Sequence, residues 1–311
     1  MNEELIISGR NIPGIDPHLH VWHWPIALDL FMGGLAAGIL FFTAWYVIAD
    51  KPMSKGMKWA TFVAPFGLVV ALICLFYDLK NKLYFWQLYT TFRIESPMSF
   101  GSWVLLFITP LSFLWAGSWM RDLIPGWGWK IGFLKTIEKW MVAYRKMMAW
   151  AVIFLAVSLG IYTGILLSAF NARPLWNTSL LGPLFLAYGL TTGAATIMWL
   201  SQEKKEQRFF TQVTLGLSVV VLFLIVHMFM GFVAGPTVQV EAAQLFLGGD
   251  YTVSFWGLVV LLGLVFPALL QILKLRGIKI PAMLPALLIL VGGFLFRYFI
   301  VEAGELTRYL Y

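Results

Sequence analysis

Eight stretches of about 20 mostly apolar residues run through this chain, and each is long enough to cross a membrane as a helix. The hydrocarbon core of a bilayer is roughly 30 Å thick and a helix rises about 1.5 Å per residue, so about 20 residues span it. The polar segments between the stretches are too short to hold a soluble domain. We therefore predict an all-α integral membrane protein with eight transmembrane helices. Their approximate bounds are Pro25–Ala49, Trp59–Leu79, Met98–Trp119, Met147–Phe170, Leu180–Leu200, Phe210–Gly235, Thr252–Leu273 and Pro281–Val301.

The composition agrees with a membrane location. Of the 311 residues, 60% are apolar and only 12% are charged, whereas an ordinary soluble domain has about 25% charged residues. So little charge could not cover the surface of a water-soluble protein. The single cysteine, Cys74, excludes a disulfide framework and a cysteine-ligated zinc or iron–sulfur centre housed within this chain. No chelating set of Asp, Glu and His occurs at helical spacing, so we also predict no metal site.

The basic residues are distributed unevenly between the two sides of the predicted helices. Fifteen Lys and Arg residues lie in the loops on one side, and six lie on the side that carries both chain ends. Basic loops are retained in the cytoplasm. We therefore expect both termini on the outer, periplasmic side of a bacterial or archaeal cytoplasmic membrane. The net charge of +7 is then an orientation signal, and no nucleic-acid partner is expected.

The remaining segments complete the predicted organisation. Residues 1–24 lack the short apolar core of a signal peptide and are expected to form an outer N-terminal tail. Residues 25–301 form the transmembrane domain, and residues 302–311 form an outer C-terminal tail. The longest separator, Met120 to Lys146, mixes Trp with Lys and predicts a helix that lies in the membrane interface.

A glycine pair recurs four helices apart, as Gly34-Leu-Ala-Ala-Gly38 in the first stretch and Gly189-Leu-Thr-Thr-Gly193 in the fifth. Both helices would run in the same direction across the membrane. An internal repeat would explain this with two parallel four-helix bundles, residues 25–170 and 180–301. The alternative is the ordinary packing of small residues between membrane helices.

Ionisable side chains inside a span cost about 2.5–3.5 kcal/mol on insertion scales, so each one is a functional candidate. The predicted spans contain few of them, and four candidates lie in the outer third: Asp29, Tyr162, His227 and Arg297. Further polar residues lie at or just beyond the same edge: His20, His23, Asp78, Glu241 and Glu302. Asp29 and Arg297 could instead form a structural ion pair, and His227 could be a hydrogen-bonded interior residue. The shared depth of these residues is more informative than any one of them, because polar groups with independent structural roles would lie at different depths in the membrane.

The chemistry of this set favours a quinone over a metal or haem. Only His227 lies well inside a span, which argues against a buried haem with two histidine ligands. A carboxylate, a phenol, an imidazole and many aromatic rings suit a lipid-soluble quinone, because its ring needs stacking surfaces and its two oxygens need hydrogen-bond donors and proton acceptors. The same groups could also hold a transported ion.

Four segments of the chain resemble the NrfD/PsrC family, the membrane subunits of polysulfide reductase-like molybdoenzyme complexes and related quinone oxidoreductases. These segments are Trp22–Gly38, Asp78–Trp86, Arg93–Trp103 and Tyr162–Asn177. The resemblance implies a quinone site near the outer face, with ligands from the first helix and from a tyrosine of the fourth. These ligands fall on Asp29 and Tyr162. The best-known polysulfide reductase pattern has a histidine at the position of Asp29 and an asparagine at that of Ile26, so the hydrogen-bonding pattern differs.

We therefore predict the membrane anchor and quinone-binding subunit of a respiratory oxidoreductase, with menaquinone or ubiquinone as ligand. Asp29 would exchange the quinol proton and Tyr162 would hydrogen-bond to a ring oxygen. The remaining candidates are quinone contacts from His20, His23 and Trp24, and proton exchange through Asp78, His227, Arg297 and Glu302. The resemblance implies two partners, a ferredoxin-like iron–sulfur subunit on the outer face and a catalytic subunit of molybdopterin type. A secondary transporter and a passive anchor without a quinone site remain the alternatives.

Overall fold

The computed structural model describes residues 22–93, 95–126 and 132–307. The described chain is all-α, and eight of its helical segments are long and apolar enough to cross a membrane, which confirms the predicted fold class. The spans are α2 (Trp24–Ile48), α3 (Lys55–Asp78), α5 (Pro97–Gly117) continued by α6 (Met120–Leu123), α8 (Arg145–Ser168), α9 (Leu181–Leu200), α10 (Lys204–Val233), the seventh span, and α14 (Met283–Leu306). The seventh span consists of α12 (Thr252–Ser254), the π-helical η3 (Phe255–Val265) and α13 (Phe266–Leu275). Short helices between the spans are η2 (Lys82–Tyr84), α4 (Gln87–Thr90), α7 (Gly132–Ala143) and α11 (Thr237–Gln244).

Most helices begin within a few residues of their predicted starts, and local chemistry explains why. The hydroxyl of Ser54 accepts a hydrogen bond from the backbone N–H of Met57 and caps α3. Ser96 caps α5 in the same way, and a proline opens that helix. The largest difference is α10, which starts at Lys204 instead of Phe210. Hydropathy marks the hydrocarbon part of a helix, and the polar first turns of α10 extend beyond it.

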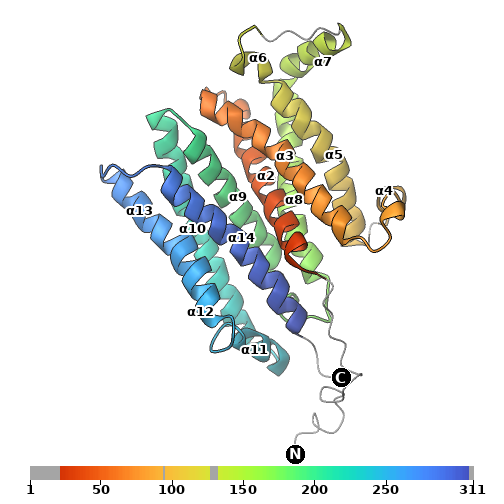
Figure 1. The fold of residues 1–311 in the computed structure, drawn as a ribbon, viewed down its shortest axis with the longest axis vertical. Coiled ribbons are helices and arrows are strands. Elements are labelled where there is room, and N and C mark those ends of the chain that lie inside the picture. The colour runs from red at the N-terminus through yellow and green to blue at the C-terminus, as the bar shows by residue number, and fades with distance from the viewer. Residues whose placement is uncertain (1–21, 94, 127–131, 308–311) are drawn as a thin grey trace, which may run out of the picture.

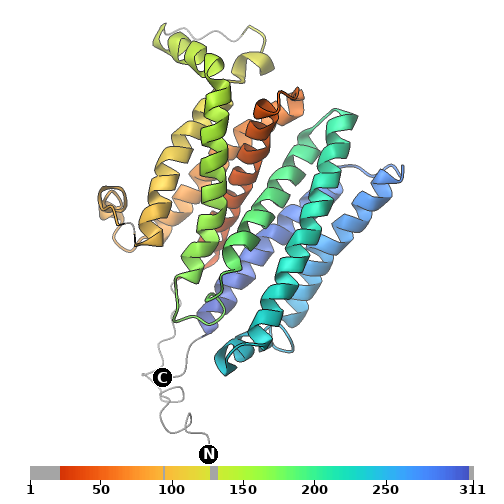
Figure 2. The same cartoon turned by 180° about the vertical axis from the view of Figure 1, so that it is seen from behind.

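The spans form two groups of four that lie side by side (Figures 1 and 2). The first bundle contains α2, α3, α5 and α8, and the second contains α9, α10, the η3–α13 span and α14. Helices α2 and α9 are the two central elements, since 83% of the apolar window of each is buried, against 33–56% for the other spans.

The two glycine pairs of the sequence meet each other where α2 crosses α9. A Cβ atom at Gly38 would collide with the carbonyl group of Gly189, and one at Gly193 would collide with the backbone of Gly38. Only glycine permits this approach of two backbones, which is a common packing mode of membrane helices. The contact explains both pairs through helix packing, and it joins the two bundles along their centre.

Both described chain ends lie at the same end of the bundle, which we call the terminal end. The backbone N–H of Trp22 donates to the carboxylate of Glu305. Arg173 donates to the carbonyl oxygens of Glu305 and Thr307, at 2.6 and 2.7 Å, and the Trp176 indole donates to Ile300 O at 2.8 Å. The segment between α8 and α9 therefore fixes the last turns of α14.

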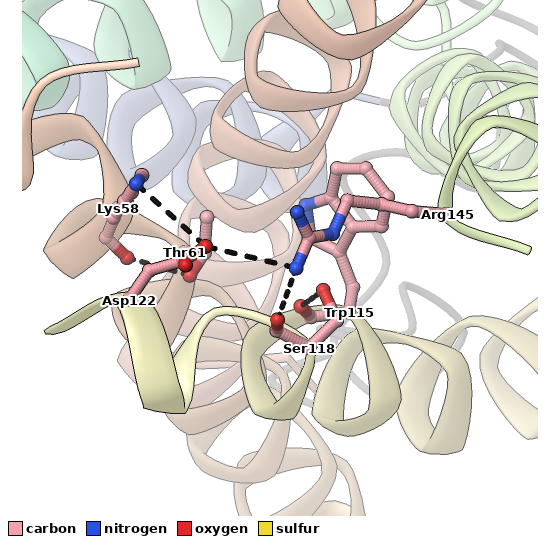
Figure 3. A network of polar contacts seen from close by, with 6 residues as sticks. All are labelled: Lys58, Thr61, Trp115, Ser118, Asp122 and Arg145. Atoms are coloured by element: carbon pink, nitrogen blue, oxygen red, sulfur yellow. Dashed lines mark hydrogen bonds and ion pairs between the residues drawn. The ribbon is translucent and has the colours of Figure 1, made fainter. Parts of the chain in front are cut away.

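The opposite end, which we call the basic end, holds the loops that are rich in Lys and Arg. Here Arg145 donates to the carbonyl oxygen of Ser118 and lies 3.8 Å from the centre of the Trp119 ring. Asp122 lies 3.7 Å from Arg145 and 3.6 Å from Lys58 (Figure 3). This network ties α3 and α8 to α6 and to the turn between α5 and α6. The predicted single interface helix over Met120 to Lys146 is wrong in detail, because α6 and α7 are separate helices.

Candidate functional site

A cavity of about 550 Å³ lies inside the first bundle, in the half nearer the terminal end. Helices α2, α3, α5 and α8 form its walls, and α4 covers it from the side. Most of the lining side chains are apolar. The polar lining residues are Asp29, Asp78, Lys80, Tyr89, Ser102 and Tyr162. An apolar cavity of this size with a few convergent polar groups is typical of a small-molecule site.

Three of these polar residues lie at one depth on three different helices. Asp29 is five residues from the terminal end of α2, Ser102 is five from that of α5, and Tyr162 is six from that of α8, which places all three about 8–9 Å along their helices. Asp29 and Tyr162 are each only 8% exposed, and they are close enough to interact electrostatically. The structure thus brings together the two residues predicted to carry the chemistry.

Asp29 and Tyr162 also have free polar atoms. Neither side chain makes a hydrogen bond or ion pair with any other residue that the structure describes. A buried carboxyl without a partner costs several kcal/mol, because it gives up water and gains nothing in return. These two groups are therefore available for a ligand in the cavity.

The position of Tyr162 is set by a glycine on the neighbouring helix. A Cβ atom at Gly101 of α5 would overlap the Cζ and hydroxyl oxygen atoms of Tyr162. The adjacent Phe100 ring lies 6.2 Å from the Tyr162 ring. The phenol packs against both of these residues of α5, and Tyr162 lines the cavity.

The outer edge of the cavity contains a short series of ionisable groups. Asp78, the last residue of α3, interacts electrostatically with both Asp29 and His23. Asp78 is half-buried and His23 is exposed at the start of α2. Asp78 thus lies between the buried carboxyl of Asp29 and the surface at the terminal end, and it lines the same cavity as Asp29. His20, predicted to assist here, lies outside the described residues.

Tyr89 and Trp22 line the cavity but were not predicted as site residues. Tyr89 is half-buried on α4, and burial raises the pKa of its phenol, which therefore stays a neutral hydrogen-bond donor at physiological pH. Its hydroxyl makes no hydrogen bond to another described residue. Trp24, which was predicted, is 58% exposed and does not line the cavity, whereas Trp22 of the same motif does and packs edge-to-face on Phe170.

Arg297 is not part of the cavity and is not paired with Asp29. It is fully buried on α14, where it donates to the carbonyl oxygens of Gly293 at 3.0 Å and Phe185 at 3.3 Å. Its guanidinium also lies 5.2 Å from the centre of the Phe185 ring. The structure therefore does not support the alternative of an Asp29–Arg297 ion pair.

His227 and Glu302 also lie away from the cavity, in the second bundle. His227 is exposed on α10 and stacks on Phe223 at 5.8 Å, so it is not an interior residue. Glu302 is half-buried on α14, one helical turn from Tyr298. Burial and the Glu302 carboxylate raise the pKa of the neighbouring Tyr251 to about 12. The depth predicted from the sequence therefore grouped residues whose side chains lie in different parts of the protein.

Comparison with known proteins places the protein in a family. It matches the family described as "Polysulphide reductase, NrfD" over residues 15–308. It is 32% identical over 304 residues to protein NrfD of Escherichia coli K12, covering 92% of this chain and 96% of that protein. It is 30% identical over 302 residues to the C subunit of polysulfide reductase from Wolinella succinogenes, covering 92% and 94%. An NrfD homologue of Haemophilus influenzae is 29% identical over 318 residues, covering 95% and 98%.

Proposed function

The chain belongs to the NrfD polysulphide reductase family, and we propose that it is the quinone-binding membrane subunit of a respiratory oxidoreductase complex. The observation that carries this proposal is the cavity in which Asp29 and Tyr162 face the same space without protein partners. Its largely apolar walls suit a quinone ring, and its few polar groups suit the two ring oxygens. Menaquinone and ubiquinone share both features.

Different residues of this chain bind a ring oxygen of the quinone and exchange its protons. Reduction of a quinone to a quinol takes up two electrons and two protons, and oxidation of the quinol releases them. The Tyr162 phenol donates a hydrogen bond to a ring oxygen, and the Asp29 carboxyl exchanges the two protons with the quinone one after the other, receiving each from water or releasing each to it. Asp78 and His23 connect Asp29 to water at the terminal end.

Electrons must pass to or from a partner, because one cysteine cannot ligate an iron–sulfur cluster within this chain. The Wolinella relative is named as the C component of a reductase, which agrees with a subunit among several. We propose a ferredoxin-like iron–sulfur subunit docked on the terminal end, and a catalytic subunit of molybdopterin type beyond it. The distribution of basic residues supports the placement of the terminal end on the outer face of the cytoplasmic membrane.

Replacement of Asp29 with Asn in the assembled complex tests the proposal. Asn has nearly the same shape but cannot exchange a proton, and general acid–base groups contribute roughly 10²–10⁴-fold to rates. Quinol-dependent electron transfer should therefore fall by at least about 100-fold. The matched control is Asp50→Asn, because Asp50 is exposed at the basic end in a surface pair with Lys146. Unchanged turnover of Asp29→Asn would exclude the assigned role of Asp29.

Two measurements separate this function from the alternatives. Organic extraction of the purified subunit should release a quinone in stoichiometric amount, whereas extraction of a passive anchor would not. Vesicles that contain the isolated subunit should show no solute uptake, whereas a secondary transporter would accumulate its substrate.

A further inference from the structure

The cavity of the first bundle has an apolar opening on its side. Four of its apolar lining side chains are strongly exposed, which marks the place where the cavity meets the surroundings. They are Ile73 and Phe76 of α3, Phe85 just before α4, and Met98 of α5, with exposed fractions of 60%, 45%, 45% and 45%. We call these four residues the lateral mouth. It lies between α3 and α5, at the same depth as Asp29 or nearer the terminal end.

The walls contributed by α2 and α8 are closed by comparison. Ile26 and Leu30 of α2 and Leu167 of α8 line the cavity and are at most 5% exposed. The other open part is polar, where Asp78 and Lys80 reach the surface at the terminal end. The cavity therefore has one polar opening toward water and one apolar opening toward the side of the bundle.

The segment around α4 borders the mouth and is fixed to α5. The hydroxyl of Ser102 donates to the carbonyl oxygen of Leu88 at 2.8 Å, and that of Ser99 donates to the carbonyl oxygen of Thr91 at 3.2 Å. Phe85 at the start of this segment packs on Phe76 at 5.9 Å. Figure 1 shows α4 beside the terminal ends of α3 and α5. These contacts hold the segment across the gap between the two helices.

We infer that the quinone reaches the cavity from the surrounding lipid through the lateral mouth, where its polyprenyl tail lies against Ile73 and Phe76. The inference rests on the proposed function and adds the route and the tail contacts. At the lateral mouth, a water-soluble substrate would meet four apolar side chains, which offer no hydrogen bonds. For a polyprenyl tail, the same side chains provide continuous apolar contact.

A second groove of about 510 Å³, between α5 and α8, is the competing route. It is also apolar, and Tyr162 lines both this groove and the cavity. The Tyr162 ring, packed against Gly101, separates the two spaces. A tail in this groove would have to displace the residue that holds the ring oxygen, whereas the lateral mouth is already open.

Narrowing the mouth tests the inference in the assembled complex. In the variant Ile73→Trp, the larger ring would obstruct the mouth without touching Asp29 or Tyr162. The control is Phe66→Trp, because Phe66 is 64% exposed on the same helix but does not line the cavity. Turnover is measured with two quinols that have the same ring, one with a polyprenyl tail and one with a methyl group in its place.

We expect Ile73→Trp to lower kcat/KM about tenfold for the tailed quinol and less than about twofold for the tail-less one, and Phe66→Trp to change neither. Equal effects of Ile73→Trp on both quinols would overturn the inference. If the wild-type complex turns over neither quinol, the proposed function itself fails, which is a different result.

A measurement on the wild-type complex avoids any folding defect of the variant. A quinone that carries a photoreactive diazirine in its tail should cross-link to Ile73, Phe76 or Met98. Cross-links at Phe154 in the competing groove, or at scattered lipid-facing positions, would overturn the inference even if the quinone binds.

Discussion

Replacement of Gly101 with Ala tests whether helix packing sets the position of the Tyr162 phenol. The added methyl group would overlap the Cζ and hydroxyl oxygen atoms of Tyr162, so either the ring must turn or α5 and α8 must separate. The ring is rigid, and turning it away from Gly101 would move it into the cavity or the groove that it lines. Overpacking of this kind costs about 1–3 kcal/mol of folding free energy. A displacement of about 1 Å at a reacting group can cost about 100-fold in rate.

The control lies on the same helix. A Cβ atom at Gly117 would meet only the Met141 side chain, at 3.6 Å from its Cε, which is an ordinary van der Waals contact. Gly117→Ala should therefore leave stability unchanged or raise it by up to about 1 kcal/mol through helix propensity. The two variants make the same chemical change, so their difference isolates the contact with Tyr162.

The assays are chemical unfolding of the purified complex and quinol turnover by the same preparation. Gly101→Ala should lose both stability and turnover. In the double variant Gly101→Ala with Tyr162→Ala, the overlap is gone, so the stability losses should not add, with a coupling energy of about 0.5–3 kcal/mol. Turnover should not recover, because the phenol is absent. Wild-type stability and turnover of Gly101→Ala would refute the assigned packing of Tyr162.

Two further substitutions test the framework that supports the site. Gly38→Ala should destabilise the protein by about 1–3 kcal/mol, because its methyl group would collide with the backbone of Gly189; Gly33→Ala on the same helix has no neighbour within 4 Å and should be neutral in the same unfolding assay. Glu206→Ala should cost more than about 2 kcal/mol, because this buried carboxylate accepts three hydrogen bonds from the start of α3 and the end of α9. The exposed neighbour Glu203 provides the control for Glu206, and equal effects of the two alanine variants would contradict the reasoning.

The eight spans could be predicted because each is a continuous apolar run of membrane length. The same apolar runs do not indicate which side of each helix faces the site. Depth along a helix follows from residue number, and it correctly grouped Asp29 with Tyr162. Rotation about the helix axis needs an amphipathic pattern, and spans that are apolar on all sides have almost none. His227 and Arg297 therefore shared the predicted depth with Asp29 but do not line the cavity.

Tyr89 was missed for a different reason. It lies in a connection that was read as an outer loop, and no pattern in that loop indicates that it folds back along α5. The fold depends on two serines of α5, whose hydroxyls donate to carbonyl oxygens of Leu88 and Thr91. Such contacts bring together residues 8 and 14 positions apart in the sequence. Neither hydropathy nor turn chemistry indicates them.

Helix α2 has two structural roles, one on each of two opposite faces. Gly38 follows Asp29 by nine residues, which is two and a half helical turns, so the two residues lie on opposite sides of the helix. The glycine side is fixed against the backbone of α9, and the aspartate side faces the cavity. A helix held by backbone contact has less freedom to rotate than one held by flexible side chains. Because Gly101 restrains Tyr162 in a similar way, both residues assigned to quinone chemistry are positioned by contacts that only glycine permits, and a preorganised site requires such rigid support.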